Sequence, residues 1–158
     1  MTANINPNWS RWVHASFVKH FHTSLSGVAY AHAEGQRRQT EGKQQWFEIR
    51  VDGPFTDEQA HKQFLLEVEI NILCCYLGED NIYALDLLTG AAANTFTYCV
   101  PCLKLGGEAG DDSSVVGYFT LIPRKKEKVE IVKFGKIRHD SDLYQATVEG
   151  HYKMELEI

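Results

Sequence analysis

The sequence predicts an α+β fold: an antiparallel or mixed sheet with two packed helices, a protruding hairpin arm and a C-terminal β-hairpin extension. Two helical patterns are separated by strand patterns, and four further strand patterns follow the second helix. Strands therefore do not alternate with crossover helices, as they would in an α/β fold. The clearest strand alternates apolar and polar residues, which is typical of a sheet with one buried face.

Length and composition predict one domain. The chain has 158 residues, of which 44% are hydrophobic and 23% charged, enough for one sizeable core. We expect a single domain over 1–158, with a core over 1–122 and a β extension over 123–158. The formal net charge of −5 argues against a protein that binds nucleic-acid phosphates over its whole surface. We expect neither a signal peptide nor a membrane span.

The N-terminal segment predicts an amphipathic helix of about four turns. Asn6 or Asn8 suits its cap, Pro7 its first turn and Gly27 its end. The apolar stripe has spacings of three and four and consists of Trp9, Trp12, Val13, Phe17, Val18, Phe21 and Leu25. The other side carries Arg11, His14, Ser16, Lys19 and His20. His14 and His20 lack the i, i+4 spacing of a helical metal site, so we expect an exposed polar face.

Strand patterns follow the first helix. Segments 28–34 and 46–51 alternate, and the polar segment 35–45 between them predicts an exposed hairpin arm or loop. Asp52-Gly53-Pro54-Phe55 predicts a turn. Segment 63–76 gives the clearest strand, with one face formed by Leu66, Val68, Ile70, Ile72 and Cys74, and the other by Glu67, Glu69 and Asn71.

The second helix is predicted to begin after Gly78, with Asp80 as its cap. Its apolar positions are Ile82, Leu85, Leu88, Ala92 and Phe96. Gly90 costs about 1 kcal/mol relative to alanine and is expected to permit close packing on the sheet. Further strands are predicted over 98–105 and 115–122, followed by a long hairpin of 129–137 and 143–158.

Four cysteines raise the question of a redox or metal centre. Cys99 and Cys102 form a C-x-x-C motif, but it follows a helix, so no helix N-terminus would lower a thiol pKa. On strands, Cys99 and Cys102 point to opposite faces, as do Cys74 and Cys75, which disfavours convergence on one zinc ion. We expect packed thiols in a reducing compartment and no catalytic, cofactor or metal site. A small cysteine-based metal-binding or redox module is the alternative.

Long polar segments indicate partner contacts rather than catalysis. The arm 35–45 and the loop 106–114 are long for a compact monomer, and such loops often order on assembly. Glu67 and Glu69 share a strand face without a nearby histidine, nucleophile or glycine-rich loop, so we expect them to face solvent or a partner. The candidate contact residues are Arg37, Arg38, Lys43, Glu67, Glu69, Lys104, Glu108, Asp111 and Asp112.

Four stretches within 8–122 together resemble small virion proteins of tailed bacteriophages: NWSRWVHASFVKHF, WFEIRVDGPF, LEVEINIL and GEDNIYALDLL. Their order is similar to that of tail-terminator or neck proteins of the lambda minor-tail type. The resemblance implies an N-terminal helix, an antiparallel sheet with a protruding hairpin, and a second helix packed on the sheet. It also implies a structural protein, not an enzyme, that forms a homo-oligomeric ring, most simply a hexamer.

Partners and location follow from the same resemblance. The ring would cap the tail tube and join it to the head connector at the head–tail junction of the virion, after assembly in the host cytoplasm. DNA would pass through the lumen without sequence-specific binding, which suits an acidic protein, and no membrane is involved. The sequence is also compatible with a tail-tube or adaptor subunit, and with a ligand-binding α+β domain of cellular origin.

Overall fold

A computed structural model describes residues 8–34, 43–60, 63–78, 82–104, 114–123, 129–136 and 142–157. Helix α1 spans Trp9–Leu25 and helix α2 spans Ile82–Asn94. The strands are β1 Tyr30–Ala33, β2 Gln45–Ala60, β3 Gln63–Leu77, β4 Cys99–Leu103, β5 Val115–Ile122, β6 Val129–Lys136 and β7 Leu143–Glu157. This order confirms the predicted α+β fold with two helices and one mixed sheet.

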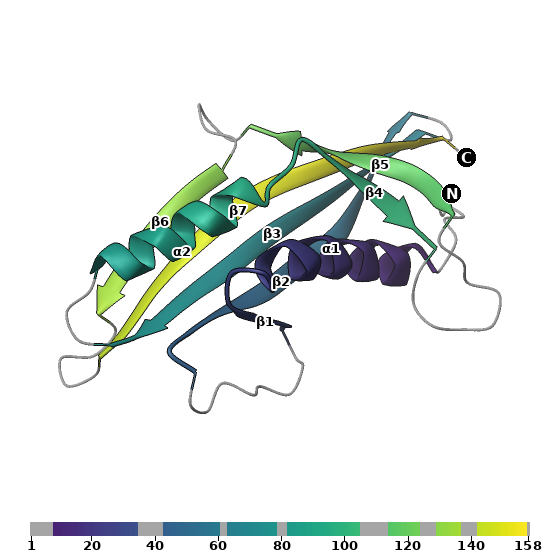
Figure 1. Cartoon of the computed structure of the whole chain (residues 1–158). Helices are drawn as coiled ribbons and strands as arrows, with labels where there is room; N and C mark the ends of the chain where they lie inside the picture. Colours follow the sequence, from purple (N-terminus) through teal and green to yellow (C-terminus); the bar gives the residue numbers. More distant parts are fainter. Residues whose placement is uncertain are drawn as a thin grey trace.

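All seven strands belong to one strongly curled sheet. Their order is β1-β2-β3-β7-β5-β4, and β6 pairs with β7 outside this path. The pairing of β1 with β2 is parallel, and the other pairings are antiparallel. Helix α1 packs against β2 and β4, while α2 packs against β3 and β7. Both helices lie on the same face of the sheet (Figure 1). We call this the helix-covered face and the opposite one the open face.

The core lies between the helices and the sheet. Alternate residues of β3 are buried under the helices as predicted: Leu66, Val68, Ile70, Ile72 and Cys74. The helices contribute Trp12, Val13, Phe17, Phe21, Leu25, Leu85, Leu88 and Ala92. Each fully buried Leu, Ile or Phe side chain contributes roughly 1.5–3 kcal/mol. Val18, which was expected in the stripe, is only half-buried and lines a groove.

Strand β7 lies in the middle of the sheet although it is the last strand of the chain. It pairs with β3 along its whole length, and with β5 and β6 on its other edge. Its buried side chains are Tyr144, Ala146, Val148, Tyr152 and Met154. The expected pairing of β6 with β7 is present. Residue 122 is nevertheless no boundary in the sheet, because 123–158 supplies its central strand.

Strands β1 and β2, which flank the polar segment 35–45, do not form a hairpin with each other. They pair in parallel, and parallel neighbours cannot be joined by a hairpin. The long hairpin of this fold is β2–β3, paired from Gln45 with Tyr76 to Ala60 with Gln63. Of the predicted arm, residues 35–42 lie outside the described part of the chain.

The turn predicted at Asp52–Phe55 is instead a bulge inside β2. Asp52 pairs with Glu69 and Phe55 pairs with Glu67, so three steps on β2 match two on β3. Gly53 has a φ of +113° and precedes Pro54 through a cis peptide bond. A Cβ on Gly53 would lie 2.8 Å from the Glu67 carbonyl oxygen, so only glycine fits there. Such bulges bend long strands, in keeping with the curl of the sheet.

The predicted helix caps are only partly accounted for. Asn8 occupies the N-cap position of α1, but its side chain makes no capping hydrogen bond. Its carbonyl oxygen accepts from the Trp12 amide at 2.9 Å instead. Asn6, Pro7 and Asp80 lie outside the described residues. Phe96 is buried as expected, but it follows the end of α2.

Two glycines have opposite surroundings. A Cβ on Gly90 would meet no atom within 4 Å, so the expectation that Gly90 permits close packing is wrong. A Cβ on Gly150 of β7 would lie 2.6 Å from the Phe96 ring. Gly150 therefore makes room for Phe96, whereas Gly90 only lowers helix propensity.

We predict that Gly150→Ala lowers the free energy of unfolding by about 1–3 kcal/mol, because the Phe96 ring must move within a packed core. Gly90→Ala should raise it by up to about 1 kcal/mol, because alanine is the better helix former. Urea denaturation followed by circular dichroism measures both. Equal stability of the Gly150→Ala and wild-type proteins would contradict the packing of Phe96 on Gly150.

Candidate functional site

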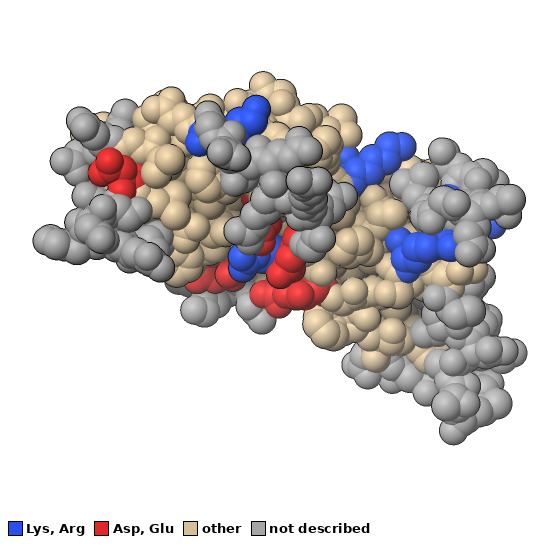
Figure 2. Space-filling model, turned by 90° about the horizontal axis from the view of Figure 1, so that it is seen from below, with Lys and Arg blue, Asp and Glu red and all other residues tan. Residues whose placement is uncertain are grey.

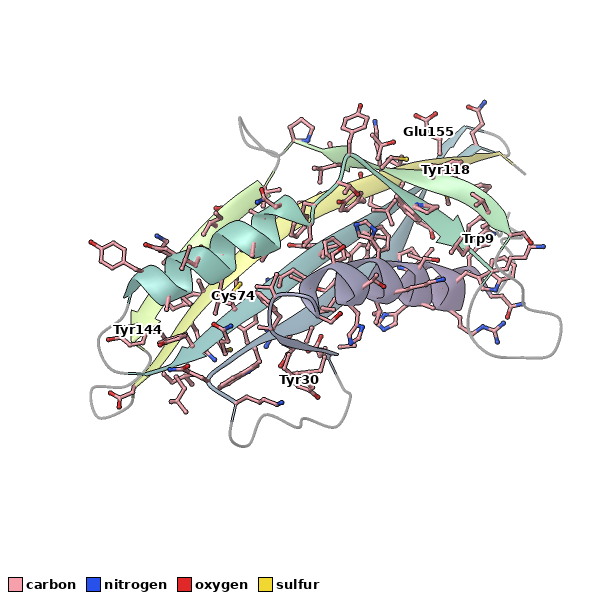
Figure 3. The ribbon with its side chains drawn as sticks, in the orientation of Figure 1. Trp9, Tyr30, Cys74, Tyr118, Tyr144 and Glu155 are labelled. Atoms are coloured by element: carbon pink, nitrogen blue, oxygen red, sulfur yellow. The ribbon has the colours of Figure 1, made fainter. Side chains whose placement is uncertain are left out.

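The four cysteines are free, and the structure separates them. Cys102 is buried in the core while Cys99 is exposed, which confirms that the C-x-x-C pair points to opposite faces of β4. Cys74 and Cys75 are both buried, and Cys74 lies under the helices on β3 (Figure 3). Burial raises the pKa of Cys74 to about 12 and that of Cys102 to about 11. Both thiols are therefore protonated and poorly nucleophilic at neutral pH.

Enclosed metal sites and membrane-spanning helices are lacking in the part of the chain that the structure describes. Within it, no group of three or more His, Cys, Asp or Glu residues is arranged to hold a metal ion. No helix there combines the length and hydropathy needed to cross a bilayer. The features that remain are surfaces rather than enclosed sites.

Four of the nine predicted contact residues can be placed. Glu67 and Glu69 lie on the open face of β3, as predicted. The Lys43 ammonium lies 5.5 Å from the centre of the Tyr30 ring, and that of Lys104 lies 5.8 Å from the centre of a Trp12 ring. These four residues belong to three separate places in the fold. The other five lie outside the described residues: Arg37, Arg38, Glu108, Asp111 and Asp112.

The open face of the sheet is acidic. Among the residues whose side chains the structure describes, cross-strand pairing places seven carboxylates on it, from Glu48, Asp52, Glu67, Glu69, Glu130, Glu149 and Glu155. Among the described side chains, the permanent cations that these strands place on the open face are Arg50 and Lys153, and Lys43 lies at the β1 margin. Glu130 lies directly opposite Glu149, and such like-charge pairs are unfavourable. The open face therefore carries an excess of negative charge.

A buried polar cluster lies at the β1–β2 end of the open face. Glu48 is only 3% exposed, and its Oε1 accepts from Arg50 Nε at 2.8 Å. This hydrogen bond raises the pKa of the Arg50 guanidinium. His32 Nε2 lies 3.9 Å from the second oxygen of Glu48. Since a buried carboxylate needs such partners, we assign the cluster a structural role.

This cluster was not predicted from the sequence. His32 and Glu48 are neighbours because they pair in register across the parallel strands β1 and β2. A parallel pairing was not expected there, and His32 on its own gives no signal. The antiparallel register of β3 with β7 similarly brings His151 Nε2 within 3.7 Å of Glu69 Oε1.

Helix α1 presents a basic surface. Its 17 residues include no Asp or Glu. We call its outward side the basic helix face, formed by Arg11, His14, Lys19 and His22. His20 lies on another side of the helix and is half-buried. His20 is held in place, because its Nε2 lies 3.1 Å from the Thr95 carbonyl oxygen. His14, Lys19 and His22 are exposed.

Two open grooves flank the basic helix face. The groove between α1 and β4 has a volume of about 230 Å³ and is lined by Ser16, Lys19, His20, Thr23, Ser24, Pro101 and Leu103. The groove between α1 and the end of β1 has a volume of about 480 Å³ and is lined by His14, Ala15, Val18, Lys19, His22, Thr23, Ala33 and Glu34. Lys19 and Thr23 line both grooves and form the ridge between them. Glu34 is a carboxylate that lines the groove at the end of β1.

Helix α2 presents an apolar surface instead. Tyr83 and Leu87, one helical turn apart, are 78% and 77% exposed. Ile131 of the neighbouring strand β6 is also exposed, and a Lys133–Asp86 ion pair joins β6 to α2. We call Tyr83, Leu87 and Ile131 the apolar α2 face. Large apolar side chains grouped in this way indicate a contact surface.

The free sheet edges differ in how open they are. The Leu121 amide donates to the Tyr98 carbonyl. In an antiparallel pair, every second residue directs its backbone N–H and C=O groups toward the partner strand. The backbone groups of Cys99, Pro101 and Leu103 therefore point away from β5. Pro101 has no N–H group, and the Leu103 N–H donates to Ser16 Oγ at 2.8 Å. The β4 edge is therefore largely blocked against further strands. Strand β6 has no such protection among the described residues.

Comparisons with known proteins bear on the fold alone. No family model matches the chain, and no curated protein matches it. One solved structure, of a protein whose description states no function, is similar with a TM-score of 0.57 and 9% sequence identity. The similarity covers 91% of this chain and 94% of the other chain. At this identity the match shows a shared fold and nothing about activity.

We predict that the native protein has one rapidly reacting thiol, Cys99, because the other three are buried. Titration with Ellman's reagent at pH 8 should give one equivalent per chain at once, and four after unfolding. Cys99→Ser should abolish the fast phase. A fast phase of two thiols in the native protein, or stoichiometric zinc by elemental analysis, would instead favour a cysteine-based centre.

We predict that Glu48→Gln lowers the free energy of unfolding by about 1–3 kcal/mol, because Arg50 and His32 lose a buried charged partner. Glu67→Gln is the matched control: Glu67 is exposed, and its substitution should change stability by less than about 0.5 kcal/mol. Thermal or urea unfolding measures both variants. Equal effects would show that the cluster adds no stability.

Proposed function

We propose that this chain is a non-enzymatic subunit of a homo-oligomeric ring at the head–tail junction of a tailed bacteriophage. The ring caps the tail tube and joins it to the head connector. Support comes first from the four stretches that resemble tail-terminator and neck proteins. The element order agrees with that resemblance: a first helix, a sheet with a long hairpin, and a second helix packed on the sheet.

The observation that carries the proposal is the apolar α2 face. Tyr83 and Leu87 point away from the core, although the rest of α2 packs well: Leu85, Leu88 and Ala92 are fully buried. Covering each exposed side chain in a subunit contact would contribute roughly 1.5–3 kcal/mol. A contact of this kind stabilises an assembly and needs no catalytic residues.

The shape of the molecule is compatible with repeated contacts between copies. The helices cover one face of the sheet, and the other face remains available over the described residues (Figure 1). The open edge at β6 adjoins α2, so apolar side chains and free backbone groups lie together. Ring subunits need two different contact surfaces, one for each neighbour.

We predict that the purified protein forms a discrete oligomer, with a mass near six times the 18.0 kDa of one chain. Leu87→Ser should shift mass photometry toward the monomer, because a buried apolar contact is lost. Val115→Ser is the matched control: Val115 is also an exposed apolar residue but lies at the start of β5, beside β4.

Three outcomes would change the proposal. A protein that stays monomeric at every concentration, and in the presence of tail tubes, would contradict the ring. Negative-stain electron microscopy would separate a terminator from a tube subunit, because a terminator gives single rings and a tube subunit gives growing tubes. An oligomer unaffected by Leu87→Ser would place the subunit contact elsewhere.

A further inference from the structure

The two sides of the molecule carry charges of opposite sign. The basic helix face lies on the helix-covered side, and α1 has no carboxylate. Among the described side chains, the open face carries seven carboxylates against the cations Arg50 and Lys153, and of the seven only Glu48 is buried. In Figure 2, seen from below, most acidic side chains gather in the middle and lower part around a basic one, a further acidic group lies at the left, and the other basic side chains lie toward the upper and right margins.

We propose that the basic helix face of one copy docks on the acidic open face of the next copy. This inference rests on the proposed ring, because it names the two surfaces through which subunits meet. The two surfaces differ, so the contact is heterologous and can close into a ring. Charge complementarity of this kind sets the orientation of partners and suppresses wrong ones.

Such a contact would reduce the electrostatic repulsion between the carboxylates of the open face. Glu130 of β6 lies directly opposite Glu149 of β7. The side chain that donates a hydrogen bond to Glu149 is neutral: Asn71 Nδ2 lies 3.0 Å from Glu149 Oε1. Glu67 is exposed and has Lys153 directly opposite, but no ion pair of suitable length joins them among the described residues. Cations from a neighbouring copy would offset this repulsion.

The shape of the helix side suits a partner with projecting side chains. Lys19 and Thr23 form a ridge with an open groove on either side. Carboxylates at alternate positions of a strand, such as Glu67 and Glu69, project from one face of a sheet and reach toward such a ridge.

A second copy is favoured over nucleic acid as the partner. The chain carries a formal net charge of −5, which repels a polyanion at long range. Lys19 is the exposed permanent cation of the basic helix face in the described structure, and a nucleic-acid surface needs several. The complementary acidic surface is present on the same chain, so each copy supplies both halves of the contact.

Charge reversal tests this contact with a matched pair of variants. Lys19→Glu and Lys153→Glu change net charge equally and both lysines are exposed, but they lie on opposite sides. At an ionic strength of about 0.05 M, Lys19→Glu should weaken assembly at least about tenfold in mass photometry. Lys153→Glu should leave assembly unchanged or tighter. Glu67→Lys should weaken it as Lys19→Glu does.

Mixing then identifies the two faces directly. Lys19→Glu protein mixed with Glu67→Lys protein should recover the wild-type mass, because each reversed face finds an opposite charge on the other variant. Melting temperatures near the wild-type value would show that the separate variants fold.

Other results would overturn the inference. Wild-type assembly that Lys19→Glu does not weaken would reject this docking and leave the ring standing. A wild-type protein that never assembles would reject both proposals. A gel shift of duplex DNA that Lys19→Glu abolishes and Lys153→Glu retains would assign the basic helix face to nucleic acid.

Discussion

The fold depends on a cluster of aromatic rings between the helices and the sheet. The Phe17 ring lies 4.9 Å from that of Phe119 and 5.1 Å from that of Tyr152, and Phe21 lies 4.9 Å from Phe96. Tyr152 also donates from its hydroxyl to the Thr97 carbonyl at 2.8 Å. Because α1 and α2 pack on different strands, this cluster joins the two halves of the helix layer to one sheet.

The core also determines which surfaces remain for partners. The helices and the sheet bury one another on a single face of the sheet. No other part of the described chain therefore packs over the outward sides of α1 and α2 or over the open face. Their side chains are free to differ in character: basic on α1, apolar on α2, acidic on the sheet. Surfaces of different character suit contacts that depend on complementarity between partners.

Much of the fold could be predicted from periodicity. The strand predicted over 115–122 matches β5, and the alternation over 63–76 identified the buried face of β3. The stripe of α1, apart from the half-buried Trp9 and Val18, and the positions of Leu85, Leu88 and Ala92 were also confirmed. Local sequence patterns failed where pairing with a neighbouring strand determines the structure. Asp52–Phe55 has the composition of a turn, but the residues on both sides of it pair with β3 and keep it within β2.

The sequence by itself determined which side of each long element is buried, because apolar spacing records that directly. It also predicted that Cys99 and Cys102 point to opposite faces, since they lie three residues apart on a strand. Only the tertiary structure decided that the last strand is central and that β1 runs parallel to β2. Strand order depends on contacts between residues far apart in the chain, which no local pattern records. The acidic open face and the His32–Glu48–Arg50 cluster follow from that order, so they became visible only once the strands were placed.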